Sequence, residues 1–321
     1  MGTGDLLGGI RYDRRWVLDR VSAFSIIDNR INAMVLLLQW LTIALAGWIA
    51  IEADWWPVYL AMGIVIGSRL QCLAVLMHDA CHRKLFSSRR VNDIIGDLFV
   101  SYPLGISIDL YRASHLRHHR HVNTDEDYDY VFQSTDPDQR FPKSRAGFAW
   151  LLVKSLLGFN LLPMLRFARV WFPSMNLHNP SRLDIDFSIP LRARYLAWLA
   201  VVFGCIAASP WTLEILGLYL IPLFVWSNVF NRMRALAEHN GVANRHELNG
   251  TRTVVPSQLD RFFIVPLNVS YHLEHHLFPT VPWINLRRLH ECLQQDDQYR
   301  REAHVTKGYL GVLRELSSVH P

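Results

Sequence analysis

Four long stretches almost free of charge restrict the fold more than any other feature of this chain. Residues 31–51 contain no charged side chain, and residues 57–77 contain only Arg69. Residues 195–213 and 215–231 are also uncharged. A helix needs about 20 apolar residues to cross a bilayer core. The sequence therefore predicts an all-α integral membrane protein with four spans, arranged as two hairpins in a four-helix bundle, rather than a soluble protein with buried helices.

Basic residues are absent from the two short loops inside these hairpins, residues 52–56 and 209–212. Because Lys and Arg accumulate in cytoplasmic segments, we expect both termini and the long middle segment at the cytoplasmic face, that of the inner membrane in a bacterium. The net charge of +5 then implies no nucleic-acid partner. Residues 1–30 lack the apolar core of a signal peptide.

We expect a single domain over residues 1–321, in which a cytoplasmic helical cap carries the histidine groups described below. Residues 83–194 mix apolar stretches with basic residues, and these stretches could be in-plane amphipathic helices or re-entrant segments. Arg69, inside a predicted span, is expected to pair with an acid or to extend to the interface. The four cysteines have no paired spacing, so neither a disulfide framework nor a cysteine-based zinc site is predicted.

Histidine carries the chemistry of this sequence. The chain has fifteen histidines, and nine of them form a pair, two triplets and a lone residue. Positions i, i+3 and i+4 share one face of a helix, so the pair HxxxH and each triplet HxxHH direct their imidazoles toward one point. The nine are His78 and His82; His115, His118 and His119; His272, His275 and His276; and His239.

Nine imidazoles are too many for one zinc ion, which takes about four ligands. They suit two transition-metal ions with open positions for oxygen, although imidazole also binds zinc, copper and nickel, so ligand type alone does not select iron. The remaining isolated histidines, such as His246 and His290, are interpreted as ordinary surface or core residues. A histidine-lined metal transporter is the non-enzyme alternative, but the groups follow helix ends and no internal repeat is visible.

The boxes HDACH, HLRHH and HLEHHLFP, in this order, resemble those of the membrane fatty acid desaturase and hydroxylase superfamily. The resemblance extends from the first span to about Leu316, and residues 279–310 resemble bacterial acyl desaturases. His239 matches the extra ligand of that family. His272, where front-end desaturases have Gln, favours other acyl types, whereas HDACH also resembles carotenoid ketolases.

This resemblance implies a di-iron centre (Fe2+/Fe3+) that activates O2, with all nine histidines as ligands in the catalytic site. It implies desaturation of a lipid-linked or thioester-linked fatty-acyl chain, with hydroxylation or ketolation of a lipid or carotenoid as the alternative. No cytochrome domain, dinucleotide fingerprint or cysteine cluster is present in the sequence. Electrons are therefore expected from a separate ferredoxin, rubredoxin or cytochrome.

Metal-bound histidines usually donate their second N–H to a carboxylate or carbonyl, so neighbouring acids are expected to orient the ligands. The acidic run at residues 125–129 could instead be a solvated loop. By resemblance, one asparagine is expected near the metal through water. These supporting candidates are Asp79, Asp127, Glu238, Glu274, His121 and Asn268.

Overall fold

The computed structural model describes residues 12–159 and 189–317. The described chain is mostly helical, as the sequence predicts. It divides into two compact units. Unit 1 comprises residues 1–28, 115–153 and 230–321, and unit 2 comprises residues 29–114 and 154–229. The single domain stays a prediction.

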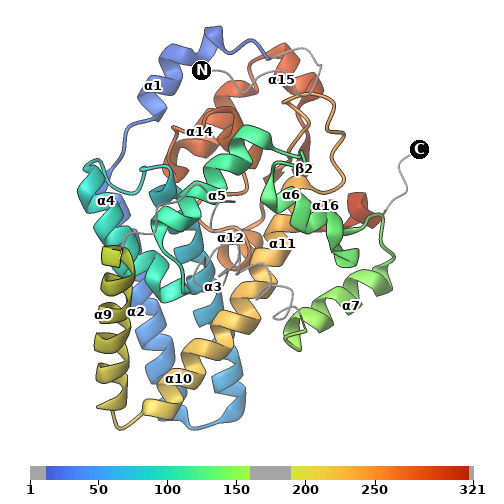
Figure 1. The fold of residues 1–321 in the computed structure, drawn as a ribbon. Helices are drawn as coiled ribbons and strands as arrows, with labels where there is room; N and C mark the ends of the chain where they lie inside the picture. The colour runs from blue at the N-terminus through green and yellow to red at the C-terminus, as the bar shows by residue number, and fades with distance from the viewer. Residues whose placement is uncertain (1–11, 160–188, 318–321) are drawn as a thin grey trace. The chain divides into compact units, whose positions relative to one another are not determined.

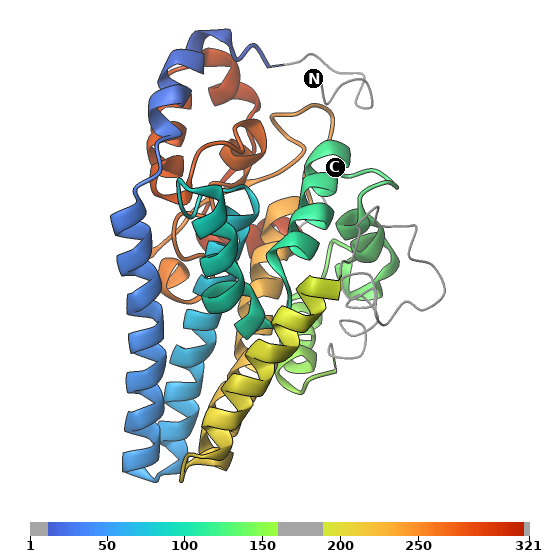
Figure 2. The same ribbon diagram turned by 60° about the vertical axis from the view of Figure 1, so that its left-hand side comes forward.

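Unit 2 contains the long apolar helices. Helices α2 (Asn29–Ala53) and α3 (Trp56–Cys81) lie side by side (Figures 1 and 2) and extend the first two predicted spans by a few residues. Helix α9 (Ile189–Ala207) contains most of the third predicted span, and its described apolar part is shorter than a full crossing. Helix α10 (Thr212–Ile221) follows it and continues through η7 (Pro222–Ser227).

Three described segments are long and apolar enough to cross a membrane: residues 29–53, 56–81 and 212–239. A fourth candidate is bent by 86° between residues 89–104 and 108–121, as in a broken span or a re-entrant loop. It comprises α4 (Arg89–Gly96), η2 (Asp97–Ser101), η3 (Tyr102–Leu104) and α5 (Ile108–His121). The protein therefore has the apolar helices of a membrane protein, and the four-span topology stays a prediction.

Close packing in unit 2 depends on a glycine of α3. A Cβ on Gly67 would lie 2.3 Å from the Cβ of Trp226 in η7, so only glycine permits this approach. Arg69, which lies inside α3, donates from its Nη1 to the amide oxygen of Gln39 on α2, 3.3 Å away. A polar side chain inside the apolar helix pair is thereby satisfied by another.

Unit 1 consists of short helices around a separate core. Helix α1 (Leu18–Phe24) packs on α14 (Trp283–Leu293), and Asn285 of α14 donates to the carbonyl of Phe24 (2.9 Å). The remaining helices are η1 (Arg15–Val17), α6 (Tyr128–Thr135), η4 (Pro137–Gln139), α7 (Arg145–Leu156), α11 (Asn228–His239), α12 (Gln258–Phe263), α13 (His272–Leu277), α15 (Asp297–Glu302) and α16 (Gly308–Ser317).

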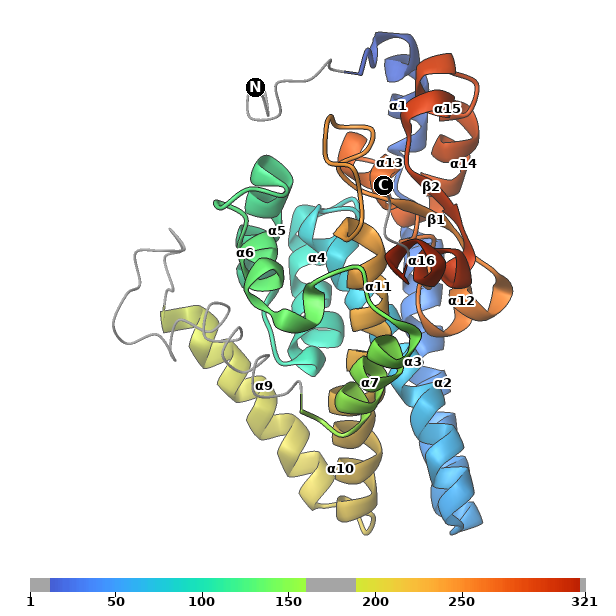
Figure 3. The same ribbon diagram turned by 90° about the vertical axis from the view of Figure 1, so that its right-hand side faces the viewer.

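The sequence does not predict the small parallel sheet of unit 1, in which β1 (Thr253–Val255) pairs with β2 (Val305–Lys307) (Figure 3). Strands of three residues are too short to show an alternating pattern. Their pairing joins segments about fifty residues apart, and α16 packs against both strands. The prediction of a purely helical fold is therefore incomplete at this point.

Candidate metal centre

The third histidine box occupies a single short helix, α13, whose two faces have different tasks. Leu273 and Leu277 belong to the hydrophobic core of unit 1. Because His272, His275 and His276 stand at i, i+3 and i+4, they are directed away from that core. The core thus fixes the helix, and the three histidines remain available to bind metal.

One group of ligands combines three helices of unit 1. His118 comes from α5, His239 from α11, and His272 and His276 from α13; one nitrogen of each lies within 4.8 Å of the others. The Nε2 atom of His272 lies 2.9 Å from that of His239 and 3.0 Å from that of His276. The lone histidine of the sequence therefore lies with histidines of the second and third boxes.

A second group lies beside it in the same unit. The Nε2 atom of His119 is 3.1 Å from that of His115 and 2.9 Å from that of His275. Each of the two triplets therefore divides its histidines between two groups: in the second box, His118 joins the first group while His115 and His119 join the second. Two metal ions, rather than one, fit this division.

The spacing of these nitrogens fits bound metal better than hydrogen bonding. A neutral imidazole has one N–H, yet the Nε2 of His272 faces two other Nε2 atoms at hydrogen-bond distance. With metal–nitrogen bonds of about 2.1 Å, ligands at right angles are separated by roughly 3.0 Å, and tetrahedral ligands by roughly 3.4 Å. The observed 2.9–3.1 Å matches right-angled ligands. The all-nitrogen donor set selects a transition metal over Mg²⁺ or Ca²⁺.

The first box belongs to unit 2, at the end of α3. The rings of His78 and His82 have centroids 5.1 Å apart, so the pair shares one face as its spacing predicts. The Nδ1 atom of His78 lies 3.7 Å from a carboxylate oxygen of Asp79, one of the predicted supporting acids.

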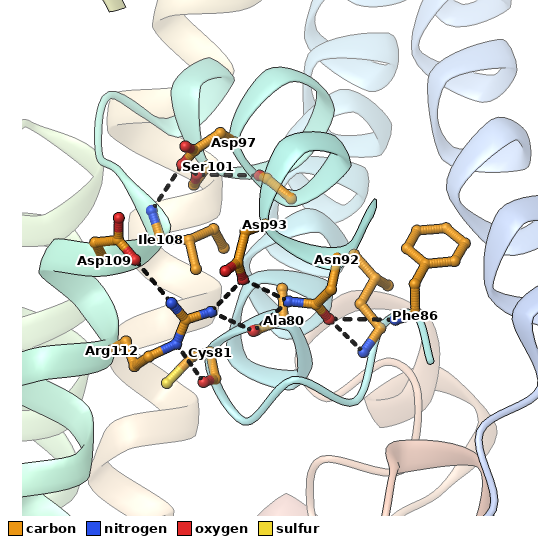
Figure 4. Close-up of polar contacts among 12 residues, drawn as sticks. Ala80, Cys81, Phe86, Asn92, Asp93, Asp97, Ser101, Ile108, Asp109 and Arg112 are labelled. Atoms are coloured by element: carbon orange, nitrogen blue, oxygen red, sulfur yellow. Dashed lines mark hydrogen bonds and ion pairs between the residues drawn. The ribbon is translucent and has the colours of Figure 1, made fainter. Parts of the chain in front are cut away.

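An arginine of α5 holds the end of α3 (Figure 4). The guanidinium of Arg112 donates to the carbonyls of Cys81 (2.9 Å) and Ala80 (3.2 Å). It also pairs with Asp93 (2.5 Å) and Asp109 (2.7 Å). The last carbonyls of a helix lack intrahelical donors, so these bonds fix the turn that carries His82.

Asn92, which is fully buried, completes this arrangement (Figure 4). Its amide group donates to the carbonyl of Ala80 (2.9 Å), and its carbonyl accepts from the backbone N–H groups of Leu85 (3.1 Å) and Phe86 (3.2 Å). A single side chain thus connects the helix end to the loop that follows the first box.

Two of the predicted acids contact ligand histidines within unit 1. Nδ1 of His118 lies 2.8 Å from the carboxylate of buried Asp127, which leaves Nε2 of His118 for metal. Nδ1 of His272 lies 3.5 Å from Glu238, whose carboxylate accepts from Arg234 (2.6 Å). Asp127 of the acidic run is therefore buried rather than solvated, and its role in orienting a metal ligand stays a prediction.

Asp129 lies close to both His118 and Asp127, with one oxygen within 4.8 Å of an atom of each. Burial raises the pKa of the Asp129 carboxyl above its usual range, and the neighbouring His118 partly opposes this shift. Two carboxyl groups thus lie behind one ligand imidazole.

The fourth predicted acid, Glu274, has a different set of partners. Its carboxylate accepts from the hydroxyls of Thr253 and Tyr299, and it lies 2.5 Å from Nδ1 of His290. Burial raises the pKa of Tyr299 well above its usual range, and the charge of Glu274 adds to the effect. Sequence reasoning missed these partners. A signal was present, because a buried glutamate inside a six-residue helix requires donors from elsewhere.

The last two supporting candidates have partners outside the ligand groups. Asn268 accepts from Arg261 (2.8 Å) and donates to the carbonyl of Trp283 (3.3 Å). Nδ1 of His121 lies 3.0 Å from Glu126. Their proposed roles at the metal stay predictions. His178 and His320, interpreted as ordinary residues, lie outside the described residues.

Comparison with known proteins gives a consistent result. The model of the fatty acid desaturase family matches residues 54–307, a range that contains all nine histidines. Dihydrorhizobitoxine desaturase of Bradyrhizobium elkanii is 27% identical over 86% of this chain and 79% of that protein. An sn-1 oleoyl-lipid 12-desaturase of Arthrospira platensis is 24% identical over 85% and 76%. A chloroplastic omega-6 fatty acid desaturase of Brassica napus is 26% identical over 76% and 56%.

Proposed function

The chain belongs to the fatty acid desaturase family, and from this premise we propose that its histidines bind two iron ions and that it introduces a double bond into a fatty-acyl chain. The overall reaction takes two hydrogens from adjacent methylenes, one O2, two electrons and two protons, and yields an alkene and two waters. Bound iron would supply the activation of O2. The protein is an oxidoreductase, and its apolar helices are those of a membrane protein.

The observation that carries this proposal is the convergence of seven histidines of unit 1 into two groups. Asp127 contacts Nδ1 of His118 at 2.8 Å, so that His118 presents Nε2 to a metal, and Glu238 lies 3.5 Å from Nδ1 of His272. The family pattern assigns His78 and His82, of unit 2, to the same ligand set. Nitrogen ligands fixed in this way leave coordination positions for oxygen.

We propose a lipid-linked or thioester-linked acyl chain as substrate, because the names of relatives include a lipid desaturase and the apolar helices give a hydrocarbon chain access from the bilayer. A separate ferredoxin, rubredoxin or cytochrome would deliver electrons at the cytoplasmic face, where we place both termini. Reporter fusions at each end test this orientation. An extracytoplasmic signal from either end contradicts it.

Product analysis tests the reaction. Purified protein loaded with Fe2+ would receive a reduced donor, 18O2 and labelled acyl lipids. A product lighter by two hydrogens and without 18O supports desaturation. A product that gains 18O without an alkene contradicts it and supports the hydroxylase or ketolase alternative.

Metal content tests the ligand assignment separately. His118→Ala and His275→Ala each remove one donor from a different group, so both variants should lose iron and activity together. His246→Ala is the matched control, because His246 lies outside both groups. Full iron content in both ligand variants would overturn the assignment.

A further inference from the structure

The lone ligand His239 is the last residue of α11, and this helix end is closed by a residue from a distant loop. The guanidinium of Arg252 donates to three carbonyls there: those of Ala237 (2.7 Å), Asn240 (2.9 Å) and Gly241 (3.3 Å). The backbone N–H of Arg252 donates to a fourth, that of Glu238 (2.8 Å). One residue therefore satisfies carbonyls that the helix itself cannot.

Arg252 lies in the interior of unit 1, where its charge is paired. Its side chain is fully buried, and its charge is balanced by Glu315 of α16, 3.1 Å away. Burial would raise the pKa of Glu315, but hydrogen bonds from His304 and Thr306 and the charge of Arg252 lower it to about 2. The acid therefore stays ionised and the guanidinium stays paired.

The next residue, Thr253, reaches the third histidine box. Its hydroxyl donates to Glu274, between His272 and His275, and accepts from the backbone N–H of Leu273 (3.3 Å). The backbone N–H of Thr253 donates to the carbonyl of His304, just before β2 (2.9 Å). Thr253 is thus fixed to the sheet and to the helix that carries three ligands.

We propose that Arg252 and Thr253 are positioning residues of the metal centre: Arg252 sets the position of His239 through α11, and Thr253 sets that of α13 through Glu274. Arg252 immediately precedes β1 and Thr253 is its first residue, so the two hold their bonding partners in a fixed relation. The inference rests on the proposed function, because it assumes that these histidines bind metal.

The required accuracy explains why such a device is needed. Metal–ligand distances must hold within about 0.2 Å, whereas one residue of helix advances about 1.5 Å. His239 has no second ligand on its own helix to fix its direction. A helix end that frays or rotates by a fraction of a residue would therefore remove His239 from its group.

The test is anaerobic titration of the purified full-length protein with Fe2+ and, separately, with Co2+, whose absorption spectrum reports coordination. Metal is counted by elemental analysis. Arg252→Met and Thr253→Val should each weaken binding about 10- to 100-fold, the range for residues that orient ligands, and should change the Co2+ spectrum. Arg252→Lys keeps the charge beside Glu315 but loses the planar fork, so it should resemble Arg252→Met.

Arg287→Met is the matched control, because Arg287 is an exposed arginine of the same unit that pairs with Glu291. It should leave affinity and spectrum unchanged. Circular dichroism of the metal-free proteins shows whether each variant folds, and Thr253→Val, a change of similar volume, preserves the test if Arg252→Met does not.

Unchanged metal affinity and spectrum in folded Arg252→Lys and Thr253→Val would overturn the inference and leave the proposed function intact. A purely structural role would lower the melting temperature of the metal-free protein without changing the Co2+ spectrum, and would also overturn it. Wild-type protein that takes up neither metal would instead contradict the proposed function.

Discussion

Helices α3 and α11 both carry candidate ligands in their last turns, but their ends are closed in different ways. The backbone adopts a left-handed conformation two residues beyond the last residue of each helix, at Arg83 after α3 (φ 58°) and at Gly241 after α11 (φ 64°). After α3, the next backbone N–H groups fold back: Lys84 donates to the carbonyl of Asp79 (2.8 Å) and Arg83 to that of Ala80 (3.0 Å). This is the Schellman pattern.

At α11 the two equivalent carbonyls, those of Ala237 and Glu238, accept from Arg252 instead. The end of α3 is thus formed by its own continuation and then reinforced by Arg112. The end of α11 depends on a residue thirteen positions further along the chain. The helix end that carries His78 and His82 is therefore stabilised mainly by neighbouring residues, whereas the helix end that carries His239 is stabilised by a residue distant in the sequence.

The strongest test compares the two arginines. Arg252→Met should destabilise the protein by about 3–5 kcal/mol, because three carbonyls at the end of α11 lose a buried donor, at about 1–3 kcal/mol each before relaxation. Arg112→Met should cost about 1–3 kcal/mol, because Asp93 and Asp109 are partly solvated and the backbone bonds of α3 remain. Tryptophan fluorescence during chemical unfolding in detergent measures both. Equal losses would contradict the distinction between local and long-range closure.

Asn92→Ala should have the next largest effect and should act only on the first box. Two backbone N–H groups and one carbonyl lose a buried partner, at about 1–3 kcal/mol in total after partial relaxation. Asn29→Ala is the matched control, because Asn29 binds the exposed Ser87 in the same loop. If the two variants unfold at the same denaturant concentration, Asn92 does not support the loop as proposed.

Local features of this molecule could be predicted from sequence. The charge-free stretches gave α2 and α3 within a few residues, and i, i+3, i+4 spacing gave the faces of the histidine boxes. The predicted fourth span stops at residue 231, yet the helical course continues to His239. Absence of charge therefore does not mark the end of this helix, because Arg234 and Glu238 pair along it.

Long-range features could not be predicted. Asp127 and Glu238 follow or precede ligands closely in sequence and were found, whereas the partners of Glu274 come from three other elements. Arg252 was missed because no periodicity marks a side chain that closes a helix from another segment. Its role becomes visible only when the chain returns through the small sheet.

The two left-handed residues give a prediction of opposite sign. Gly241→Ala should destabilise by about 1–2 kcal/mol, and its Cβ would also lie 2.7 Å from Leu316. Arg83→Gly should stabilise by up to about 1 kcal/mol, because glycine adopts this conformation without strain. The same unfolding assay applies. A stabilising Gly241→Ala would show that this turn is not held by Arg252 and Leu316 as described.

The last prediction concerns Glu315, which supports Arg252 from α16. Its pKa is about 2 in the folded protein, below the ordinary 4.5. A carboxyl group whose pKa is lower in the folded than in the unfolded protein stabilises the folded state at any pH above its unfolded pKa. This contribution disappears as the pH falls from 4.5 toward 2. The melting temperature of metal-free wild type should therefore exceed that of Glu315→Gln by a constant amount between pH 5 and 7, and the difference should shrink below about pH 4.5.

Asp13 provides the control for this measurement, because its pKa is also lowered to about 2, by Arg15, but the pair is fully exposed. Exposed ion pairs contribute little to stability, so Asp13→Asn should melt with wild type at every pH. Metal-free protein is required, since protonation of histidine releases metal in acid. A difference for Glu315→Gln that persists unchanged to pH 2 would mean that Glu315 supports Arg252 by packing and not by charge. The end of α11 would then rest on the guanidinium fork of Arg252 alone.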